Sequence, residues 1–279
     1  MNTASTTVPT VTLNNGITMP QLGFGVFQVG DEETTAAVAT ALETGYRSID
    51  TAAIYGNEAG VGRALAESGI PREELFVTTK LWLADMGREK TRAPLLTSLE
   101  KLGLDHVDLY LIHWPGTDTD AYLESWQVLE ELQAEGLTRA IGVSNFAPEQ
   151  LERIVALDGT VPAVNQIELH PLLQNRETAS VNLAHGIATE AWSPLAQGAA
   201  LTEPAVLAAA AAHSVTPAQV VIRWHLQGGN VVIPKSVTAS RMASNFDVFA
   251  FELSAEEMTA IDALEHDGRT GPHPLTFNG

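Results

Sequence analysis

Four polar side chains stand where this chain could do chemistry, each at or just beyond the end of a short β-rich run. They are Asp50, Tyr55, Lys80 and His113. When such runs form neighbouring parallel strands of a barrel, their carboxyl ends meet at one rim, and catalytic groups gather there. An acid, a phenol, an ammonium and an imidazole are therefore expected to converge. Lysine is scarce in this chain, which makes Lys80 the most informative of the four.

The chemistry that these groups suit is the donation of a proton to a carbonyl oxygen. A free tyrosine has a pKa near ~10, and an adjacent ammonium stabilises the phenolate and lowers that pKa. Lys80 would supply this charge to Tyr55, and Asp50 would hold Lys80 in place. His113 would orient the carbonyl by a hydrogen bond. No side chain can donate a hydride, so the sequence predicts a nicotinamide cofactor as the reductant.

Two other functions would use the same residues. Lys80 at a strand end would also serve as the nucleophile of a Schiff-base aldolase. A barrel that binds the cofactor without turning over a carbonyl would be a cofactor-sensing, non-catalytic subunit, because a fold does not fix a function. Taken singly, each residue also has a purely structural interpretation. Asp50 and Lys80 would form an ion pair, His113 would be a hydrogen-bonded core histidine, and Tyr55 would anchor a loop. We expect no metal, because His113, His170 and Asp50 show no recognised ligand spacing.

A phosphate site is predicted just after the last β-rich run, at 231–233. Lys235 and Ser236 follow this run, and Arg241 comes at the start of the next predicted helix, with Asn245 beyond it. A lysine, a hydroxyl and an arginine beside a helix N-terminus favour a bound phosphate. Because the chain has a net charge of −19, two cations at one rim position indicate an anionic ligand there.

Other rim residues have the chemistry to hold a nicotinamide and a substrate. Hydroxyl and amide groups follow the fifth run or lie in the sixth, and an indole that can stack on a ring ends the seventh. These candidate nicotinamide contacts are Ser144, Asn145, Gln166 and Trp192. Apolar side chains near the same rim would form the mouth of a substrate pocket. These candidates are Phe27, Ile54, Trp82 and Trp114.

The elements that must position these residues alternate between short β-rich runs and longer stretches of helical period, which is typical of βαβ units. Eight such units close a (β/α)8 TIM barrel in ~250 residues, so we predict one α/β barrel domain over residues 1–279. The predicted strands are 22–27, 47–50, 75–79, 107–112, 139–143, 164–168, 187–192 and 231–233. A β-hairpin over 11–18, turning at Asn15 and Gly16, is predicted to plug the barrel floor.

An open, doubly wound sheet is the competing architecture, and it normally carries G-x-G-x-x-G after its first strand. Gly23 and Gly25 lack the third glycine and lead into no immediate helix. Gly60 and Gly62 fall inside a predicted helix rather than at its start. The glycine pattern therefore favours the barrel.

The composition limits the function further. The chain has 279 residues, 45% of them hydrophobic, which is enough for a large core. So acidic a chain lacks the basic face that nucleic acids require, and we expect no such partner. It has no cysteine, which excludes disulfides and thiolate metal sites. The N-terminus has no secretory pattern and no apolar stretch is long enough to span a membrane, so we expect a cytoplasmic protein without a membrane partner. We also expect a monomer.

Three stretches resemble the aldo-keto reductases, together over about residues 15–245. They are GYRSIDTA at 45–52 with YGNE at 55–58, LYLIHWP at 109–115 with IGVSNF at 141–146, and IPKS at 233–236. The string VNQIELHP at 164–171 is most similar to the bacterial 2,5-diketo-D-gluconate reductases. The resemblance implies a (β/α)8 barrel that binds NADPH or NADP+ and a catalytic tetrad at Asp50, Tyr55, Lys80 and His113.

The same resemblance implies the activity and the rest of the site. The activity is the NADPH-dependent reduction of small aldehydes and ketones, including keto-sugar acids or α-dicarbonyls, to alcohols, with Tyr55 as general acid. The implied cofactor contacts are Ser144, Asn145, Gln166, Trp192, Ser193, Leu195, Lys235, Ser236, Val237, Arg241 and Asn245. Thr238 and Ser244 depart from the usual arginine and acidic residue, which bears on the choice between NADPH and NADH. The tail after Glu265 is short, so an open substrate pocket is expected.

Overall fold

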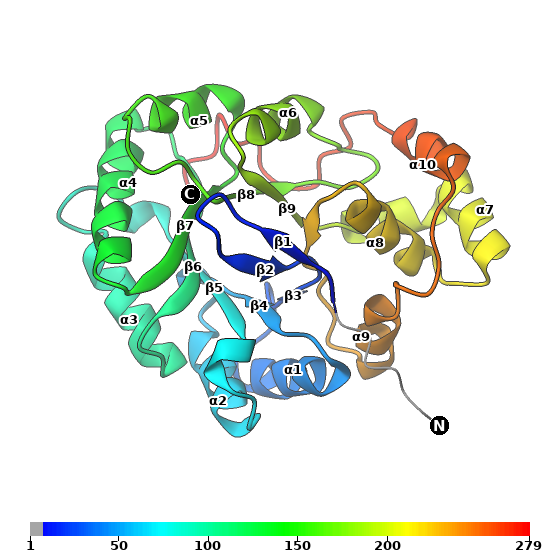
Figure 1. The fold of residues 1–279 in the computed structure, drawn as a ribbon, viewed down its shortest axis with the longest axis horizontal. Coiled ribbons are helices and arrows are strands. Elements are labelled where there is room, and N and C mark those ends of the chain that lie inside the picture. Colours follow the sequence, from blue (N-terminus) through cyan, green and yellow to red (C-terminus); the bar gives the residue numbers. More distant parts are fainter. Residues whose placement is uncertain (1–7) are drawn as a thin grey trace.

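A computed structural model describes residues 8–279; residues 1–7, part of the segment in which no secretory signal is predicted, lie outside the described part. Within it, eight parallel strands follow one another in chain order around a curled sheet, and helices surround them (Figure 1). The strands are β3 (Phe24–Gly25), β4 (Ser48–Asp50), β5 (Phe76–Leu81), β6 (Val107–Ile112), β7 (Thr138–Ser144), β8 (Val164–Glu168), β9 (Ala188–Trp192) and β10 (Val231–Val232). The predicted (β/α)8 barrel is confirmed.

The sheet closes between its first and last strands. Leu22 forms a parallel bridge with Val232, and the Gly23 N–H donates to the Val232 carbonyl at 2.9 Å. β3 is shorter than the predicted strand at 22–27 because its pairing with β4 covers only Phe24 and Gly25. β5 extends two residues past the predicted end at 79, since its pairing with β6 continues to Leu81. Lys80 therefore lies inside a strand, where its backbone pairs with Leu111 of β6.

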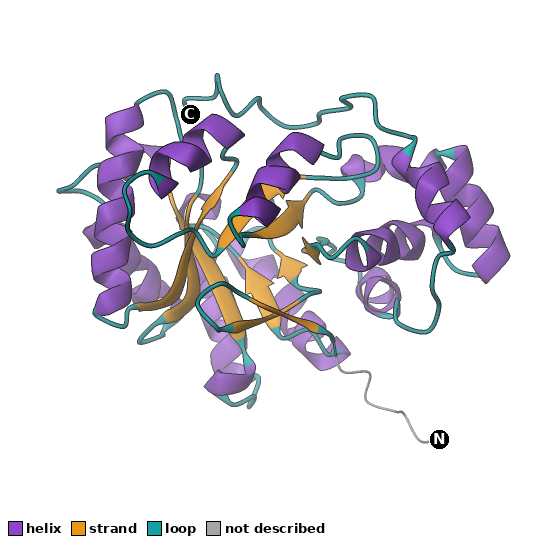
Figure 2. Cartoon of the chain, turned by 45° about the horizontal axis from the view of Figure 1, so that its top comes forward, coloured by secondary structure: helices purple, strands orange, loops and turns teal. Residues whose placement is uncertain are grey.

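A hairpin of β1 (Thr10–Thr12) and β2 (Thr18–Pro20) covers the amino-terminal end of the barrel (Figure 2). The Leu13 N–H donates to the Ile17 carbonyl across the loop at 2.8 Å, and Gly16 takes a φ of 84°, which favours glycine. Leu13 and Met19 are buried in one apolar cluster with Phe76 at the start of β5. The predicted plug at the barrel floor is confirmed.

Helices cover the outside of the sheet (Figure 1). They are α1 (Asp31–Thr44), α2 (Glu58–Glu67), α3 (Arg92–Leu102), α4 (Thr119–Ala134), α5 (Pro148–Val155), α6 (Arg176–Ala184), α7 (Pro204–His213), α8 (Pro217–Gln227), α9 (Ala239–Phe246) and α10 (Ala255–Asp262). Local sequence fixes several helix ends. The Ser254 hydroxyl accepts from the Glu257 N–H at 3.2 Å and so caps α10, while Pro148 opens α5 with a preset φ.

α2 packs closely against α1 and α3 because glycines remove side chains at the contacts. A Cβ at Gly60 would lie 2.3 Å from the Asp31 carbonyl oxygen, and one at Gly62 would lie 2.6 Å from the Leu102 carbonyl oxygen. The Gly-x-Gly string at 60–62 is therefore a packing feature inside a helix. This agrees with its exclusion as a dinucleotide loop.

The segment after α10 crosses the carboxyl end of the barrel, opposite the hairpin (Figure 2). The buried Glu168 carboxylate, at the end of β8, holds it by accepting from the N–H groups of Thr270 at 2.6 Å and Gly271 at 3.1 Å. Farther along, the Phe277 ring lies 4.5 Å from the Trp114 ring. The short tail therefore reaches Trp114, one of the predicted substrate residues, and the more open pocket stays a prediction.

Among residues 8–279, no single helix is long and apolar enough to cross a membrane. α7 and α8 pass that test only as a pair, and they bend by 96° at the break between them. Their apolar side chains, such as Val206 and Val220, are buried together in one core cluster, which accounts for the composition of the pair.

Candidate active site

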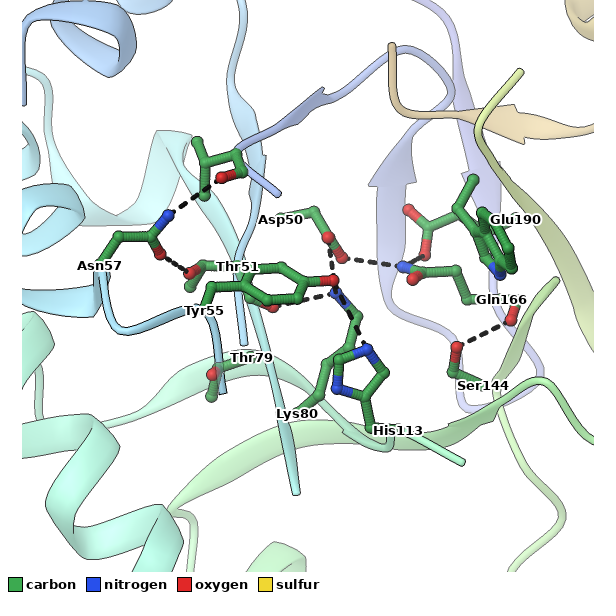
Figure 3. Close-up of polar contacts among 12 residues, drawn as sticks. Asp50, Thr51, Tyr55, Asn57, Thr79, Lys80, His113, Ser144, Gln166 and Glu190 are labelled. Atoms are coloured by element: carbon green, nitrogen blue, oxygen red, sulfur yellow. Dashed lines mark hydrogen bonds and ion pairs between the residues drawn. The ribbon is translucent and has the colours of Figure 1, made fainter. Parts of the chain in front are cut away.

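Asp50, Tyr55, Lys80 and His113 come together at the carboxyl end of the barrel (Figure 3). Lys80 Nζ donates to Asp50 Oδ1 at 2.6 Å and to the Thr51 carbonyl oxygen at 2.9 Å. It also lies 3.4 Å from Tyr55 Oη. Tyr55 Oη in turn lies 3.5 Å from His113 Nε2. One phenol hydroxyl therefore contacts both an ammonium and an imidazole.

The loop after β4 sets the position of Tyr55. A single 3₁₀ turn, η1 (Ala53–Tyr55), carries the residue, and Gly56 ends the turn with a φ of 69°. Buried Asn57 fastens the loop by accepting from the Thr51 hydroxyl at 2.8 Å and donating to the Val26 carbonyl at 2.9 Å. These bonds tie the Tyr55 loop to the neighbouring β3 loop and keep the phenol at the mouth.

The environment of Tyr55 differs from the prediction in one respect. Burial raises the pKa of the Tyr55 phenol above 10, and the nearby Lys80 charge lowers it by less than burial raises it. The sequence prediction of a net lowering was wrong, because desolvation of the phenolate outweighs the attraction of one ammonium. Tyr55 is therefore protonated throughout the neutral range and is available as a proton donor.

His113 is electrically neutral in this setting. Burial lowers its pKa well below 6.5, and the positive charge of Lys80 lowers it further. The ring stands edge-on to Trp82, with their centroids 5.3 Å apart. A neutral imidazole can donate or accept one hydrogen bond at Nε2 but is not a strong acid, so it suits the orientation of a carbonyl rather than its protonation.

Lys80 is held as an ammonium. Its side chain is fully buried, which is the largest single effect and disfavours the charge, but Asp50 together with Tyr55 and Glu190 outweighs burial, and the pKa of Lys80 is raised. A Schiff-base lysine needs a neutral amine, usually obtained by a lowered pKa. The structure therefore argues against the aldolase alternative.

Ser144, Asn145, Gln166 and Trp192 form a second cluster beside the first. Asn145 has a φ of 64°; its Nδ2 donates to the His113 carbonyl at 3.0 Å and its Oδ1 accepts from Trp192 Nε1 at 2.8 Å. The Ser144 hydroxyl donates to the Gln166 backbone carbonyl at 2.9 Å. Gln166 Nε2 reaches Asp50 Oδ2 at 2.8 Å. Gln166 and Asn145 are thus hydrogen-bonded directly to the predicted tetrad, and Ser144 and Trp192 are bonded to these two residues.

The predicted phosphate residues lie farther out, in the loop after β10 and in the first turn of α9. Lys235 and Arg241 are exposed, and neither forms an ion pair with another described residue. Ser236 is nearly buried and its hydroxyl accepts from the Thr238 N–H at 3.1 Å, directly before α9 begins. The remaining predicted cofactor residues are the exposed Val237, the buried Asn245, and Ser193 and Leu195, both partly exposed in the loop after β9.

The predicted substrate residues gather around Tyr55 and His113. The exposed Phe27 ring lies 5.0 Å from the Tyr55 ring, and Trp82 stands against His113. Trp114 contacts Trp192, with centroids 6.4 Å apart. Ile54 is half exposed beside Tyr55 in η1. Together these side chains give the mouth an apolar rim.

The sequence prediction missed Phe277 and Glu190. Phe277 packs on Trp82 and Trp114, but a lone aromatic near a chain end carries no signal of its partners. Glu190 is buried inside β9, and Gln166 Nε2 donates to it at 2.8 Å. An acidic residue in the middle of a predicted strand was a signal that could have been used. In residues 8–279, no three His, Asp or Glu side chains are grouped so as to hold a metal ion.

Comparison with known proteins bears on this arrangement. The chain matches the Aldo/keto reductase family over residues 21–266. It is 53% identical over 270 residues to an aldo-keto reductase of Mycolicibacterium smegmatis, covering 97% of this chain and 98% of the relative. It is 52% identical over 274 residues to the methylglyoxal reductase DkgA of Escherichia coli, covering 97% and 99%. A crystal structure of a Gox0644 mutant in complex with NADPH has a TM-score of 0.94 and 45% identity, covering 98% of this chain and 100% of that one.

The barrel and the relatives together define an oxidoreductase of the class that reduces carbonyl groups. The chain belongs to the aldo-keto reductase family. The family resemblance predicted from three sequence motifs is therefore confirmed.

Proposed function

We propose that this protein reduces small aldehydes and ketones, α-dicarbonyls and keto-sugar acids among them, with NADPH as the reductant. The observation that carries the proposal is the placement of Tyr55 Oη, which lies 3.4 Å from Lys80 Nζ and 3.5 Å from His113 Nε2 at an apolar mouth. A carbonyl oxygen bound there would meet a protonated phenol and a neutral imidazole. All of these groups come from one barrel, so the proposal includes a single domain that works as a monomer.

Each side chain has a role in the proposed reaction. Tyr55 donates its proton to the carbonyl oxygen as that oxygen becomes an alkoxide, which is a far stronger base than a phenolate. Lys80 stabilises the phenolate left behind, and Asp50 keeps Lys80 charged. His113 orients the carbonyl oxygen through Nε2. In the reverse direction, the phenolate of Tyr55 accepts the proton of an alcohol.

The residues beside the tetrad fit a nicotinamide nucleotide. Ser144, Asn145 and Gln166 present hydroxyl and amide groups for a carboxamide, and Trp192 presents an indole fixed by its bond to Asn145. Lys235 and Arg241 are exposed cations near the N-terminus of α9, suited to a 2′-phosphate. When bound, NADPH supplies the hydride that no side chain can provide.

The substrate class follows from the mouth and from one relative. The aromatic rim of Phe27, Trp82, Trp114 and Phe277 suits a small carbonyl compound rather than a polymer. The Escherichia coli relative is named a methylglyoxal reductase, and methylglyoxal is a small α-dicarbonyl. We therefore place α-dicarbonyls first among the carbonyl compounds to be tested.

The experiment follows the loss of reduced-nicotinamide absorbance with NADPH and NADH in parallel, against aldehydes, α-dicarbonyls and diketo-sugar acids. We expect carbonyl-dependent loss that is faster with NADPH. Equal rates with the two cofactors would keep the reductase and remove the phosphate assignment. Cofactor binding without any turnover would favour a cofactor-sensing subunit instead.

Arg241→Ala is expected to weaken NADPH binding about 10- to 150-fold, because a charge-assisted hydrogen bond to phosphate contributes about 1.5–3 kcal/mol. NADH lacks the 2′-phosphate, so its Kd should be unchanged. The measurement is the ratio of the two Kd values, with Arg88→Ala as control, since Arg88 is an exposed arginine paired with Glu131 elsewhere on the barrel. Equal weakening of both cofactors would contradict the assignment.

A further inference from the structure

Glu190 is a buried acid that the proposed reaction leaves without a role. It lies in β9, in register with Gln166 of β8 and Val231 of β10, and its side chain is about 1% exposed. An acidic side chain is rarely enclosed in this way unless it is paired, because burial of its charge is costly. Its partner is the amide of Gln166, which lies beside Asp50 of the tetrad (Figure 3).

The Gln166 amide nitrogen donates to two carboxyl groups at once. One hydrogen bond runs to Asp50 Oδ2 and the other to Glu190 Oε2, both at 2.8 Å. An amide NH₂ has two hydrogens, so these bonds use its full donor capacity. The reverse orientation would place the carbonyl oxygen of Gln166 against the Asp50 carboxylate, which has no proton to donate. The two carboxyl groups therefore fix the orientation of the amide. Its Nε2 points inward, toward Asp50 and Glu190, and its Oε1 points away from them.

The two carboxyl groups are not equivalent. Asp50 has a donor at each oxygen, Lys80 at Oδ1 and Gln166 at Oδ2. Glu190 has a donor at Oε2 only, and no described residue bonds its buried Oε1. Burial, and next the negative charge of Asp50, raises the pKa of Glu190 to about 8. Glu190 is therefore the protonated member of the pair at neutral pH, and Asp50 is the anion that faces Lys80.

We propose that Glu190 is a positioning residue of the cofactor site: together with Asp50 it holds the Gln166 amide nitrogen inward, so that Gln166 Oε1 is left to accept a hydrogen bond from a bound carboxamide. This rests on the proposed function, which places a nicotinamide beside Gln166. With Nε2 held by the two carboxyl groups, Gln166 Oε1 can accept from the NH₂ of a carboxamide, whereas the flipped amide would offer that ligand a donor and would meet its carbonyl oxygen instead. Glu190 thereby selects a ligand group that it does not touch.

The test compares the Kd of NADP+ with the Kd of 2′,5′-ADP, a fragment that carries the 2′-phosphate but no nicotinamide. Glu190→Leu fills a similar volume and removes the acceptor. We expect this variant to raise the Kd of NADP+ about 10-fold, as the loss of one positioned hydrogen bond would. The Kd of 2′,5′-ADP should be unchanged. Gln166→Leu should have the same effect, and the double variant should be no weaker than Gln166→Leu alone, because the two residues act as a unit.

Each outcome is decisive. If the Glu190→Leu variant binds NADP+ as tightly as the wild type, the inference is wrong while the proposed function stands. The same holds if its affinities for NADP+ and 2′,5′-ADP fall equally. If the wild type binds neither ligand, both fail. Glu58→Gln removes another buried carboxylate, which accepts from Thr79 on β5, and should leave both Kd values unchanged. A change there equal to that of Glu190→Leu would mark a general packing effect and overturn the inference.

Glu190→Gln gives a second readout that keeps the shape of the side chain. The charged groups facing Glu190 are Asp50 of β4, Lys80 of β5 and Tyr55 of η1, while its strand neighbours Gln166 and Val231 do not titrate. When Glu190 is ionised, its charge raises the pKa of Tyr55. Alcohol oxidation needs the Tyr55 phenolate, so its pH profile should move to lower pH in Glu190→Gln. An unmoved profile would show that Glu190 is not coupled to the site and would overturn the inference.

Discussion

Replacing Tyr55 by phenylalanine is expected to lower kcat for carbonyl reduction by about 10³-fold, within the range that a positioned proton donor contributes. The ring would keep its contact with Phe27, so the Kd for NADPH should be unchanged. Because burial raises the pKa of Tyr55 and His113 is neutral, wild-type reduction should hold through neutral pH and fall only in the alkaline range where the phenol ionises. The measurement is kcat against pH, with NADPH binding followed by fluorescence.

The matched control is Tyr110→Phe. Tyr110 lies in β6 and its hydroxyl is buried without a partner among the described residues, so removing it should leave kcat as in the wild type. If Tyr55→Phe retained full turnover, Tyr55 would not be the acid. A loss of reduction centred near pH 6.5 in the wild type would instead point to an imidazolium donor at His113.

Lys80→Met is expected to lower kcat by about 10²- to 10⁴-fold and to destabilise the fold as well. Methionine matches the length of the lysine side chain but leaves Tyr55 without a charge that stabilises its phenolate. It also leaves Asp50 as a buried acid without its cation, a change that costs about 3–5 kcal/mol in comparable buried pairs. Denaturant unfolding and steady-state kinetics measure the two effects separately.

The double variant Lys80→Met with Asp50→Asn separates stability from chemistry. Removing both members of a buried ion pair restores much of the stability lost when one is removed. We therefore expect the double variant to unfold at higher denaturant concentration than Lys80→Met while its kcat stays equally low. Recovery of turnover in the double variant would show that Lys80 acts only through stability.

Much of the site could be predicted because a parallel barrel turns sequence position into spatial position. Asp50 and His113 stand at the ends of β4 and β6, and the carboxyl ends of such strands meet at one rim whatever their separation along the chain. Lys80 needed only its place in β5 to be put beside them. Local signals were also sufficient at the hairpin, whose glycine turn and alternating apolar residues specify the plug of the barrel floor.

The remaining features depend on contacts that no local pattern encodes. Thr270 bonds to Glu168 across 102 residues of chain, so the path of the tail could not be inferred from its own sequence. The pKa of Tyr55 was predicted with the wrong sign because the sequence revealed the charge of Lys80 and not the extent of burial. Glu190 was visible as an acid in a strand, but its pairing with Gln166 emerges only from the register of β8 and β9.

The Glu168 anchor of the tail divides the molecule into a fixed part and a replaceable part. The acid and base groups stand on strands and on one short turn, whereas Phe277 lies on a segment that is tied at Thr270 and Gly271 and then runs free of the sheet. In the proposed mechanism, sequence changes beyond that tie would reshape the opening for the substrate without disturbing the groups proposed to transfer its proton. Substrate range and catalytic power can therefore diverge independently among proteins that share this barrel.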